Sequence, residues 1–196
     1  VVLINGRPLS VNYAEKAAGA ILEAWYPGSH GGTAVAMALL GEYNPGGKLT
    51  VTFPRSVGQI PFNFPCKRAS QVDCRKGLGP DGWQSRVNGS LYDFGYGLSY
   101  TSFAYSDLRL SSSSIAPADS VQVSFNVTNT GKLRGDEVVQ LYVEDCLSSI
   151  TVYEKTLRGF ERLSLDPGET KTVTFRLGPK ELSLLDRNMN RVVEPG

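Results

Sequence analysis

The stretch Trp25-Tyr26-Pro27-Gly28-Ser29-His30-Gly31-Gly32, followed by Gly41-Glu42-Tyr43-Asn44-Pro45-Gly46-Gly47-Lys48-Leu49-Thr50-Val51-Thr52-Phe53-Pro54, decides the fold of the first half of the chain. Glycine and proline stand at each change of direction, and the residues between the two stretches are mostly small or apolar. They predict a helix that begins near Gly31 and stops at Gly41, because glycine readily adopts the left-handed conformation that closes a helix. A strand is expected from Lys48 to Phe53.

The residues before this stretch predict two more strands and a helix. Val1–Ile4 is an apolar run typical of a buried strand, and Ile21–Trp25 is a second strand that ends at a proline-glycine turn. Alanines favour a short helix over residues 12–19. Strands that alternate with helices indicate a layered α/β sheet. Because the chain opens on an apolar strand with no methionine, we expect it to begin inside a domain.

The second half of the chain predicts a β-sandwich. Val121–Val127 and Thr170–Leu177 alternate apolar and polar residues, as half-buried strands do. Further strands are expected at Glu137–Val143 and Leu157–Leu165. Turn sequences such as Asp166-Pro167-Gly168-Glu169 separate them. The predicted fold class is therefore α/β followed by all-β.

A long segment, residues 54–100, joins the two halves and is rich in glycine, proline, serine and asparagine. It exceeds the usual length of a connection, which indicates either a functional loop or one packed against a large neighbour. Its end, Tyr92–Tyr100, is too aromatic for a free linker, so we expect these rings to hold two domains together.

The composition excludes several classes of protein. The 196 residues are 41% hydrophobic and 20% charged, with a formal net charge of +1. These values are typical of a globular protein and give no clustered basic surface for nucleic acid or an anionic membrane. No apolar run approaches the roughly 20 residues that are needed to span a bilayer.

The three cysteines and the single histidine do not predict a metal site. No C-x-x-C spacing occurs, and His30 is distant in sequence from every cysteine. Cys66 and Cys74 flank a short polar loop, so a disulfide between them is sterically allowed; plain thiols are the other interpretation. Cys146 stands alone in a strand-like segment.

Three groups of motifs follow one another along the chain. The first is W-Y-P-G-x-x-G-G with G-x-Y-N-P-G-G-K-L at 25–53, and the second is F-G-Y-G-L-S-Y-T at 94–101. The third comprises V-T-N-T-G, G-D-E-V-V-Q-L-Y, G-F-E-R and L-x-P-G-E-T between residues 127 and 170. In this order they resemble the C-terminal portion of glycoside hydrolase family 3, of the β-glucosidase and β-xylosidase type. The loop Lys76–Gly82 with Arg86–Gly89 is similar to the Bacteroides-type members, most of them exported.

The resemblance covers essentially the whole chain and implies its domains. Residues 1–99 would be the C-terminal portion of the family's α/β-sandwich domain, including the long loop and the connector. Residues 100–196 would be a fibronectin type III-like domain. The sequence stops at Val192–Gly196, where the family continues into a last strand, so we expect a truncated sheet with an exposed edge.

The resemblance also implies a retaining, exo-acting hydrolase of β-glucosides or β-xylosides that needs no metal or organic cofactor. Such enzymes use two carboxylates about 5 Å apart, one as nucleophile and one as acid/base. In the family, the nucleophile is an aspartate of an N-terminal barrel, and the acid/base is a glutamate that precedes the strand matching Val1–Ile4. Neither motif has a matching position here, so we assign no catalytic residue and expect the chain alone to be inactive.

The partners implied by the resemblance are a β-linked oligosaccharide or glycoside, the missing N-terminal barrel domain of the same protein, and a second copy in a homodimer. Neither nucleic acid nor a membrane is expected, and the implied location is periplasmic or secreted. Two other interpretations stay open. One is a non-catalytic carbohydrate-binding or adhesion module built on the β-sandwich, and the other is a fragment that assembles with a separate barrel chain.

Asp81, Trp83 and Arg86, on the long loop, are the candidate substrate-binding residues. If the loop reaches the sugar-binding cleft, Trp83 would stack on a pyranose ring and Asp81 or Arg86 would hydrogen-bond its hydroxyl groups. The alternative is a solvated loop with Trp83 packed on a neighbouring domain.

Residues 25–32 are expected to be structural. His30 lacks an accompanying nucleophile or second ligand, so we interpret it as a turn, cap or interdomain residue. The three glycines of 28–32 fit neither a P-loop nor G-x-G-x-x-G, which favours close packing over phosphate binding. Trp25 and Tyr26 are expected in the core rather than as a sugar platform.

Overall fold

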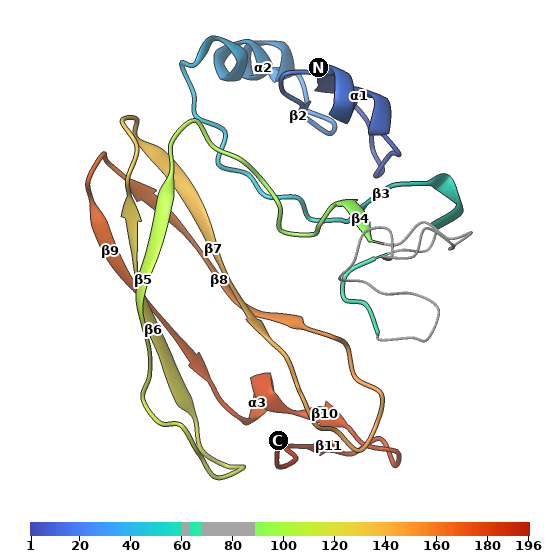
Figure 1. The fold of residues 1–196 in the computed structure, drawn as a ribbon, viewed down its shortest axis with the longest axis vertical. Coiled ribbons are helices and arrows are strands. Elements are labelled where there is room, and N and C mark those ends of the chain that lie inside the picture. The colour runs from blue at the N-terminus through green and yellow to red at the C-terminus, as the bar shows by residue number, and fades with distance from the viewer. Residues whose placement is uncertain (60–62, 68–88) are drawn as a thin grey trace. The chain divides into compact units, whose positions relative to one another are not determined.

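The computed structural model describes residues 1–59, 63–67 and 89–196 (Figure 1). The chain divides into two compact units, Val1–Leu98 and Ser99–Gly196. Among the described residues, no helix has the length and apolar character that crossing a membrane requires.

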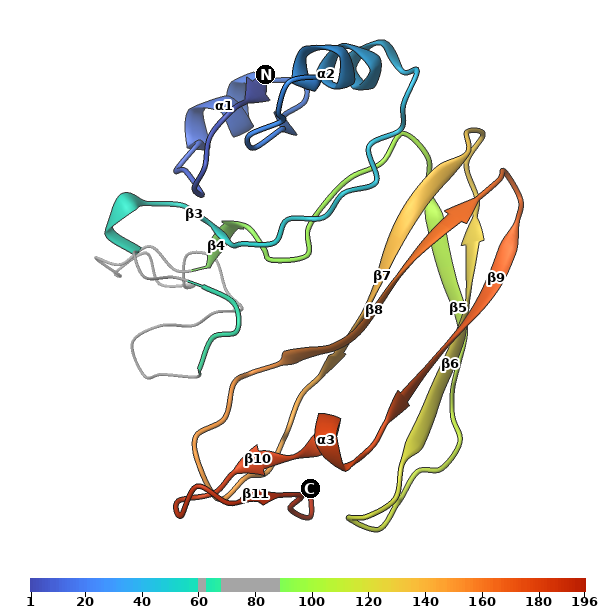
Figure 2. The ribbon, with the colours of Figure 1, turned by 180° about the vertical axis from the view of Figure 1, so that it is seen from behind.

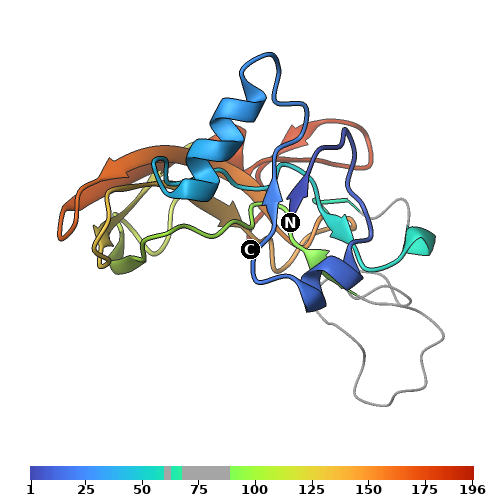
Figure 3. The ribbon, with the colours of Figure 1, turned by 90° about the horizontal axis from the view of Figure 1, so that it is seen from above.

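The first unit opens with a pair of parallel strands. β1 (Val2–Leu3) pairs with β2 (Leu22–Glu23), and α1 (Asn12–Ala17) lies between them in the sequence. Figure 3 shows the two strands side by side. The strands expected here are present but shorter than predicted. Each has only the other as its neighbour among the described residues, so few backbone groups are paired.

Helix α2 (Gly31–Leu40) begins and ends where the sequence predicts. Gly41 follows it in the left-handed conformation, with φ of 79°. The Gly41 N–H donates to the carbonyl of Ala38 at 3.2 Å, and the Glu42 N–H donates to that of Met37 at 2.9 Å. These bonds satisfy carbonyl groups that the last helical turn leaves open.

The strand expected at Lys48–Phe53 is wrong in its extent. Strand β3 covers only Phe53–Pro54. It pairs antiparallel with β4 (Ser90–Tyr92), which follows the long loop in the sequence. The 3₁₀ turn η1 (Val57–Gln59) follows β3. Ahead of Phe53, the backbone of Leu49 pairs with Tyr96 and Gly95 through single hydrogen bonds rather than as part of a strand.

The second unit is the predicted β-sandwich (Figure 2). One sheet has the order β5-β6-β9, and the other pairs β7 with β8, all antiparallel. The bounds are Phe103–Leu110 for β5, Val121–Asn129 for β6, Gly135–Val143 for β7, Thr156–Leu165 for β8 and Thr170–Leu177 for β9. The short helix α3 (Pro179–Leu182) and the hairpin of β10 (Leu184–Leu185) and β11 (Arg191–Val192) follow.

Alternate residues of the strands form the core of the sandwich. Eight buried apolar side chains make one cluster: Val123, Phe125, Val127, Val139, Leu163, Leu165, Val173 and Leu177. In the described part of the first unit, the buried apolar side chains are those of Ala38, Phe53 and Pro54. Because apolar burial is the main driving force of folding, the sandwich gains much more stability from its core than the described part of the first unit does.

Asn129, which is fully buried at the end of β6, joins several segments of the sandwich. Its Oδ1 accepts hydrogen bonds from the Thr101 hydroxyl at 2.7 Å and the Gly131 N–H at 3.1 Å. Its Nδ2 donates to the carbonyls of Leu133 at 2.8 Å and Leu165 at 3.0 Å. A side-chain amide has two donors and two acceptor positions, so this group is fully satisfied.

A tyrosine-glutamate contact joins the two sheets. The Tyr105 hydroxyl of β5 donates to Glu137 Oε1 of β7 at 2.8 Å. Burial raises the pKa of Tyr105 above its ordinary value, and the hydrogen bond to Glu137 and the negative charge of that residue add to the rise. The folded protein therefore holds the phenol proton more tightly than the unfolded chain does.

We expect Tyr105→Phe to reduce the alkaline sensitivity of the second unit. Above about pH 10 the unfolded chain loses the phenol proton while the folded protein keeps it, so stability falls as pH rises through the folded pKa. The slope from this group is at most about 1.4 kcal/mol per pH unit, and less here because Tyr105 is 51% exposed. Denaturant unfolding from pH 9 to pH 11.5 should show the stability difference between wild type and variant shrinking. Parallel curves, or an equal effect of Tyr153→Phe, would contradict the assignment.

Candidate functional site

The two ends of the long segment are held together by what we call the loop base, residues 47–59 and 89–97. The Leu49 N–H donates to the carbonyl of Tyr96 at 2.8 Å, and the Gly95 N–H donates to that of Leu49 at 2.7 Å. Strands β3 and β4 continue this antiparallel pairing toward the loop. Residues that are about 40 positions apart in the sequence are thereby brought into register.

Aromatic rings support the loop base from one end to the other. Phe53 lies 5.9 Å from the ring of Trp25 and 6.2 Å from that of Tyr92, measured between centroids. Tyr92 in turn stacks on Tyr96 at 5.3 Å. Burial raises the pKa of Tyr92, and the charges of Glu15 and Tyr96 add to the rise. These phenol and indole groups therefore pack the loop base, and Tyr92 remains a neutral phenol at physiological pH.

The side chain of Gln59 adds a second set of hydrogen bonds across the loop base. Its Oε1 accepts the N–H groups of Arg55 at 2.7 Å and Ser56 at 3.1 Å. Its Nε2 donates to the carbonyl of Gly89 at 2.9 Å. The carbonyl of Arg55 accepts bonds from Ser10 and Asn12, which connect the loop base to α1. Both ends of the segment 55–89 are thus fixed by side chains as well as by strand pairing.

A short described piece inside the segment also packs against the loop base. Phe64 stacks on Phe94 with ring centroids 4.5 Å apart, and the Phe64 N–H donates to Thr52 Oγ1 at 3.3 Å. Cys66 takes part in a disulfide, whereas Cys146 is an exposed free thiol. Cys74, the third cysteine, lies outside the described residues.

The three predicted substrate-binding residues, Asp81, Trp83 and Arg86, lie outside the described residues. The structure therefore brings together the ends of the loop that carries them, and their roles stay predictions. Of the four carboxylates between residues 42 and 93, Glu42 and Asp93 are described, and both are exposed. Asp93 accepts a short hydrogen bond from the Ser90 hydroxyl, within the turn that begins at β4.

The described residues contain no group of three or more histidine, cysteine, aspartate or glutamate side chains that could hold a metal ion. His30 occupies the position before α2, where its carbonyl accepts the Ala34 N–H at 3.0 Å and its side chain makes no capping bond. This placement agrees with a turn residue at the helix start.

The three glycines between residues 28 and 32 are present for different structural reasons. Gly28 has a φ of 73°, which disfavours any side chain. A Cβ on Gly31 would lie 2.5 Å from the ring of Pro27, so Gly31 is required for close packing. Gly32 has open space around it. Close packing therefore holds for one of the three.

Trp25 and Tyr26, both expected in the core, differ in environment. Trp25 is half-buried against Phe53, in a left-handed conformation with φ of 50°. Tyr26 is 78% exposed, so its assignment to the core is wrong. Its ring instead covers the backbone at Gly6, where a Cβ would lie 2.5 Å from Tyr26 Cε2.

Comparison with known proteins identifies the family. Residues 1–100 match the family model described as the glycosyl hydrolase family 3 C-terminal domain. The chain belongs to glycoside hydrolase family 3. Residues 137–196 match the fibronectin type III-like domain. The predicted fold class, an α/β portion followed by an all-β fibronectin type III-like sandwich, is confirmed.

Relatives from the family match the chain over its full length. It is 50% identical to a β-xylosidase of Formosa agariphila and 44% identical to a periplasmic β-glucosidase of Salmonella typhimurium, covering 100% of this chain and 26% of each relative. The crystal structure of a Listeria innocua β-glucosidase in complex with glucose superimposes with a TM-score of 0.88 at 35% identity, covering 100% of this chain and 27% of that one. The chain thus spans about a quarter of the length of these family 3 enzymes.

Sequence reasoning missed the residues that close the loop base. Gln59 and Gly97 gave no local signal, because their partners are 30 and about 50 positions away. A family alignment that showed both to be invariant would have pointed to them.

Proposed function

We propose that the chain is the C-terminal part of a retaining, exo-acting glycoside hydrolase that cleaves β-glucosides or β-xylosides. The observation that carries this proposal is that the whole of this chain is similar to part of a β-xylosidase and of a β-glucosidase, at 50% and 44% identity. Retaining hydrolysis needs two carboxylates about 5 Å apart. Since this sequence carries neither catalytic motif, both would come from the N-terminal part of the same protein.

In this proposal the chain shapes one wall of the active-site cleft and packs the domains together. Its domains would be residues 1–99 and 100–196, and the loop anchored at the loop base would carry Asp81, Trp83 and Arg86 toward the sugar. The fixed ends of that loop support the proposal, because a side chain that positions a substrate must itself be held in place. The same proposal includes a periplasmic or secreted location, supported by the name of the Salmonella relative, and a homodimer.

The test compares this chain with a longer protein that includes the upstream coding sequence. We expect the longer protein to hydrolyse p-nitrophenyl β-glucoside or β-xyloside and the 196-residue chain to hydrolyse neither. In the longer protein, Trp83→Ala and Arg86→Ala should raise KM about tenfold or more, the loss expected for one stacking or charged contact.

Each contrary result has a defined meaning. Hydrolysis by the isolated chain would contradict the proposal and direct attention to the carboxylates of residues 42–93. Inactivity of both proteins, with sugar binding by this chain, would favour the non-catalytic binding module. Activity that appears only on mixing with a separate barrel chain would favour the assembled fragment. An unchanged KM in both variants would remove Trp83 and Arg86 from the substrate site.

A further inference from the structure

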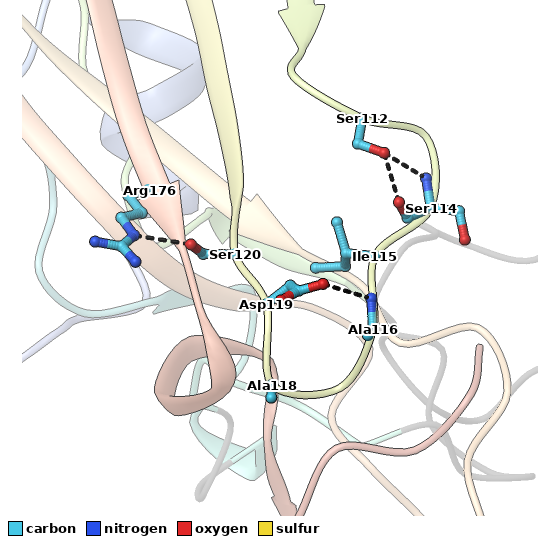
Figure 4. Close-up of a pocket in the computed structure, with 8 residues that line it drawn as sticks. All are labelled: Ser112, Ser114, Ile115, Ala116, Ala118, Asp119, Ser120 and Arg176. Atoms are coloured by element: carbon cyan, nitrogen blue, oxygen red, sulfur yellow. Dashed lines mark hydrogen bonds between the residues drawn. The ribbon is translucent and has the colours of Figure 1, made fainter.

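The second unit has a shallow polar pocket at one end of its three-stranded sheet (Figure 4). Its volume is about 740 Å³, and it is open to solvent along one side. The turn between β5 and β6 supplies most of the wall, and β9 supplies an arginine. The lining residues are Ser112, Ser114, Ile115, Ala116, Ala118, Asp119, Ser120 and Arg176.

The wall of the pocket is fixed by hydrogen bonds within the turn. Ser112 Oγ accepts the N–H of Ser114 at 3.2 Å. Asp119 Oδ2 accepts the N–H of Ala116 at 3.3 Å, and the Asp119 N–H donates to the Ala116 carbonyl at 2.9 Å. The polar side chains of the turn are therefore held in position before any ligand arrives.

Arg176 is also held in position. Its Nε donates to Ser120 Oγ at 2.9 Å, and its neighbour across the sheet is Gln122 of β6. This bond uses the inner nitrogen of the guanidinium group. Among the described residues, no hydrogen bond or ion pair occupies its two terminal nitrogens. An anchored arginine with free terminal N–H groups is prepared to donate to a ligand oxygen.

The chemistry of the lining favours a neutral ligand rich in hydroxyl groups. Arg176 offers donors, and Asp119 Oδ1 offers an acceptor with no bond to a described residue. Their opposite formal charges cancel, so a phosphate or carboxylate that gained from Arg176 would be repelled by Asp119. A sugar hydroxyl both donates and accepts, and the half-buried Ile115 can contact the C–H face of a sugar ring.

We propose that this pocket is a binding site for a neutral oligosaccharide. Its wide opening suits a chain of sugars better than a single enclosed ring. The site would hold a carbohydrate without cleaving it, because the pocket contains a single carboxylate and hydrolysis needs two. The inference goes beyond the proposed hydrolase activity and does not depend on it.

The experiment is an amide NMR titration of the 196-residue chain with cellotetraose, xylotetraose and, separately, potassium phosphate. We expect one or both tetrasaccharides to shift the amide signals of Ser114, Ala116 and Ser120 saturably. Arg176→Ala and Asp119→Asn should each weaken this binding about tenfold or more, the loss expected for a charged hydrogen-bond partner. Arg187→Ala, an exposed arginine outside the pocket, should leave it unchanged.

Three results would overturn the proposal. One is the absence of saturable shifts up to the solubility limit of both sugars. A second is a response of these amides to phosphate alone, which would make the pocket an anion site. The third is equal weakening by Arg176→Ala and Arg187→Ala. A retained amide spectrum outside the pocket verifies that each variant folds, and Asp119→Asn decides the question if Arg176→Ala does not fold.

Discussion

Replacement of Asn129 by aspartate should cost the second unit about 3–5 kcal/mol of stability. The change exchanges the donating Nδ2 for an oxygen that faces the carbonyls of Leu133 and Leu165, at 2.8 and 3.0 Å. It also places a carboxylate at a fully buried position. A domain of this size has a total stability of about 5–15 kcal/mol, so a substantial share of it would be lost.

Chemical denaturation of the second unit, monitored by the circular dichroism of its strands, measures the effect of Asn129→Asp. The matched control is Asn188→Asp, which makes the same chemical change at an exposed position of the same unit. The control should change stability by about 0.5 kcal/mol or less. A loss below about 1 kcal/mol for Asn129→Asp would show that the amide network is not a main support of the sandwich.

Gly97→Ala should open the loop base. A Cβ at residue 97 would lie 2.4 Å from the carbonyl oxygen of Gly47 and 3.3 Å from Lys48 Cα, both backbone atoms that cannot rotate away. The two segments must separate, at a cost of about 3 kcal/mol. We expect the amide hydrogens of Leu49 and Gly95 to exchange about a hundredfold faster as a result.

Gly47→Ala is the control for Gly97→Ala, because a Cβ at residue 47 meets nothing within 4 Å. In the longer protein, Gly97→Ala should also lower hydrolytic activity about tenfold to a hundredfold, since the loop base would no longer hold the loop in place. Equal exchange rates in the two variants would refute the role of the close contact. Faster exchange with unchanged activity would instead separate the loop base from the substrate site.

The sandwich was largely predictable because its strands are half-buried and alternate in the sequence. The alternation of Val121–Val127 directly reports which residues reach the core, and the structure places Val123, Phe125 and Val127 there. Asn129, by contrast, is a polar residue of a type common in turns, yet it is the last residue of β6 and is buried. Its polar character fits the core only because four partners satisfy it, and two of them, Thr101 and Leu165, are 28 and 36 positions away in the sequence.

The candidate site was much less predictable. The loop base depends on pairing between segments about 40 residues apart, and no local pattern encodes that register. Tyr26 shows the same limit, because an aromatic residue beside a proline-glycine turn is compatible with a core position or an exposed one. The helix ending at Gly41 could be predicted because the signal for its end is local.

Because the loop base holds both ends of the enclosed segment, the length of that segment has little effect on the stability of the rest of the chain. Once both ends are tied by Gln59 and by β3 and β4, doubling the number of enclosed residues costs only about 0.6 kcal/mol of closure entropy. Insertions and deletions in this segment that leave the contacts of Phe64 and the disulfide of Cys66 intact should therefore be tolerated by the rest of the chain. Related enzymes could therefore acquire different substrate preferences by changes in this segment while the loop base stays the same.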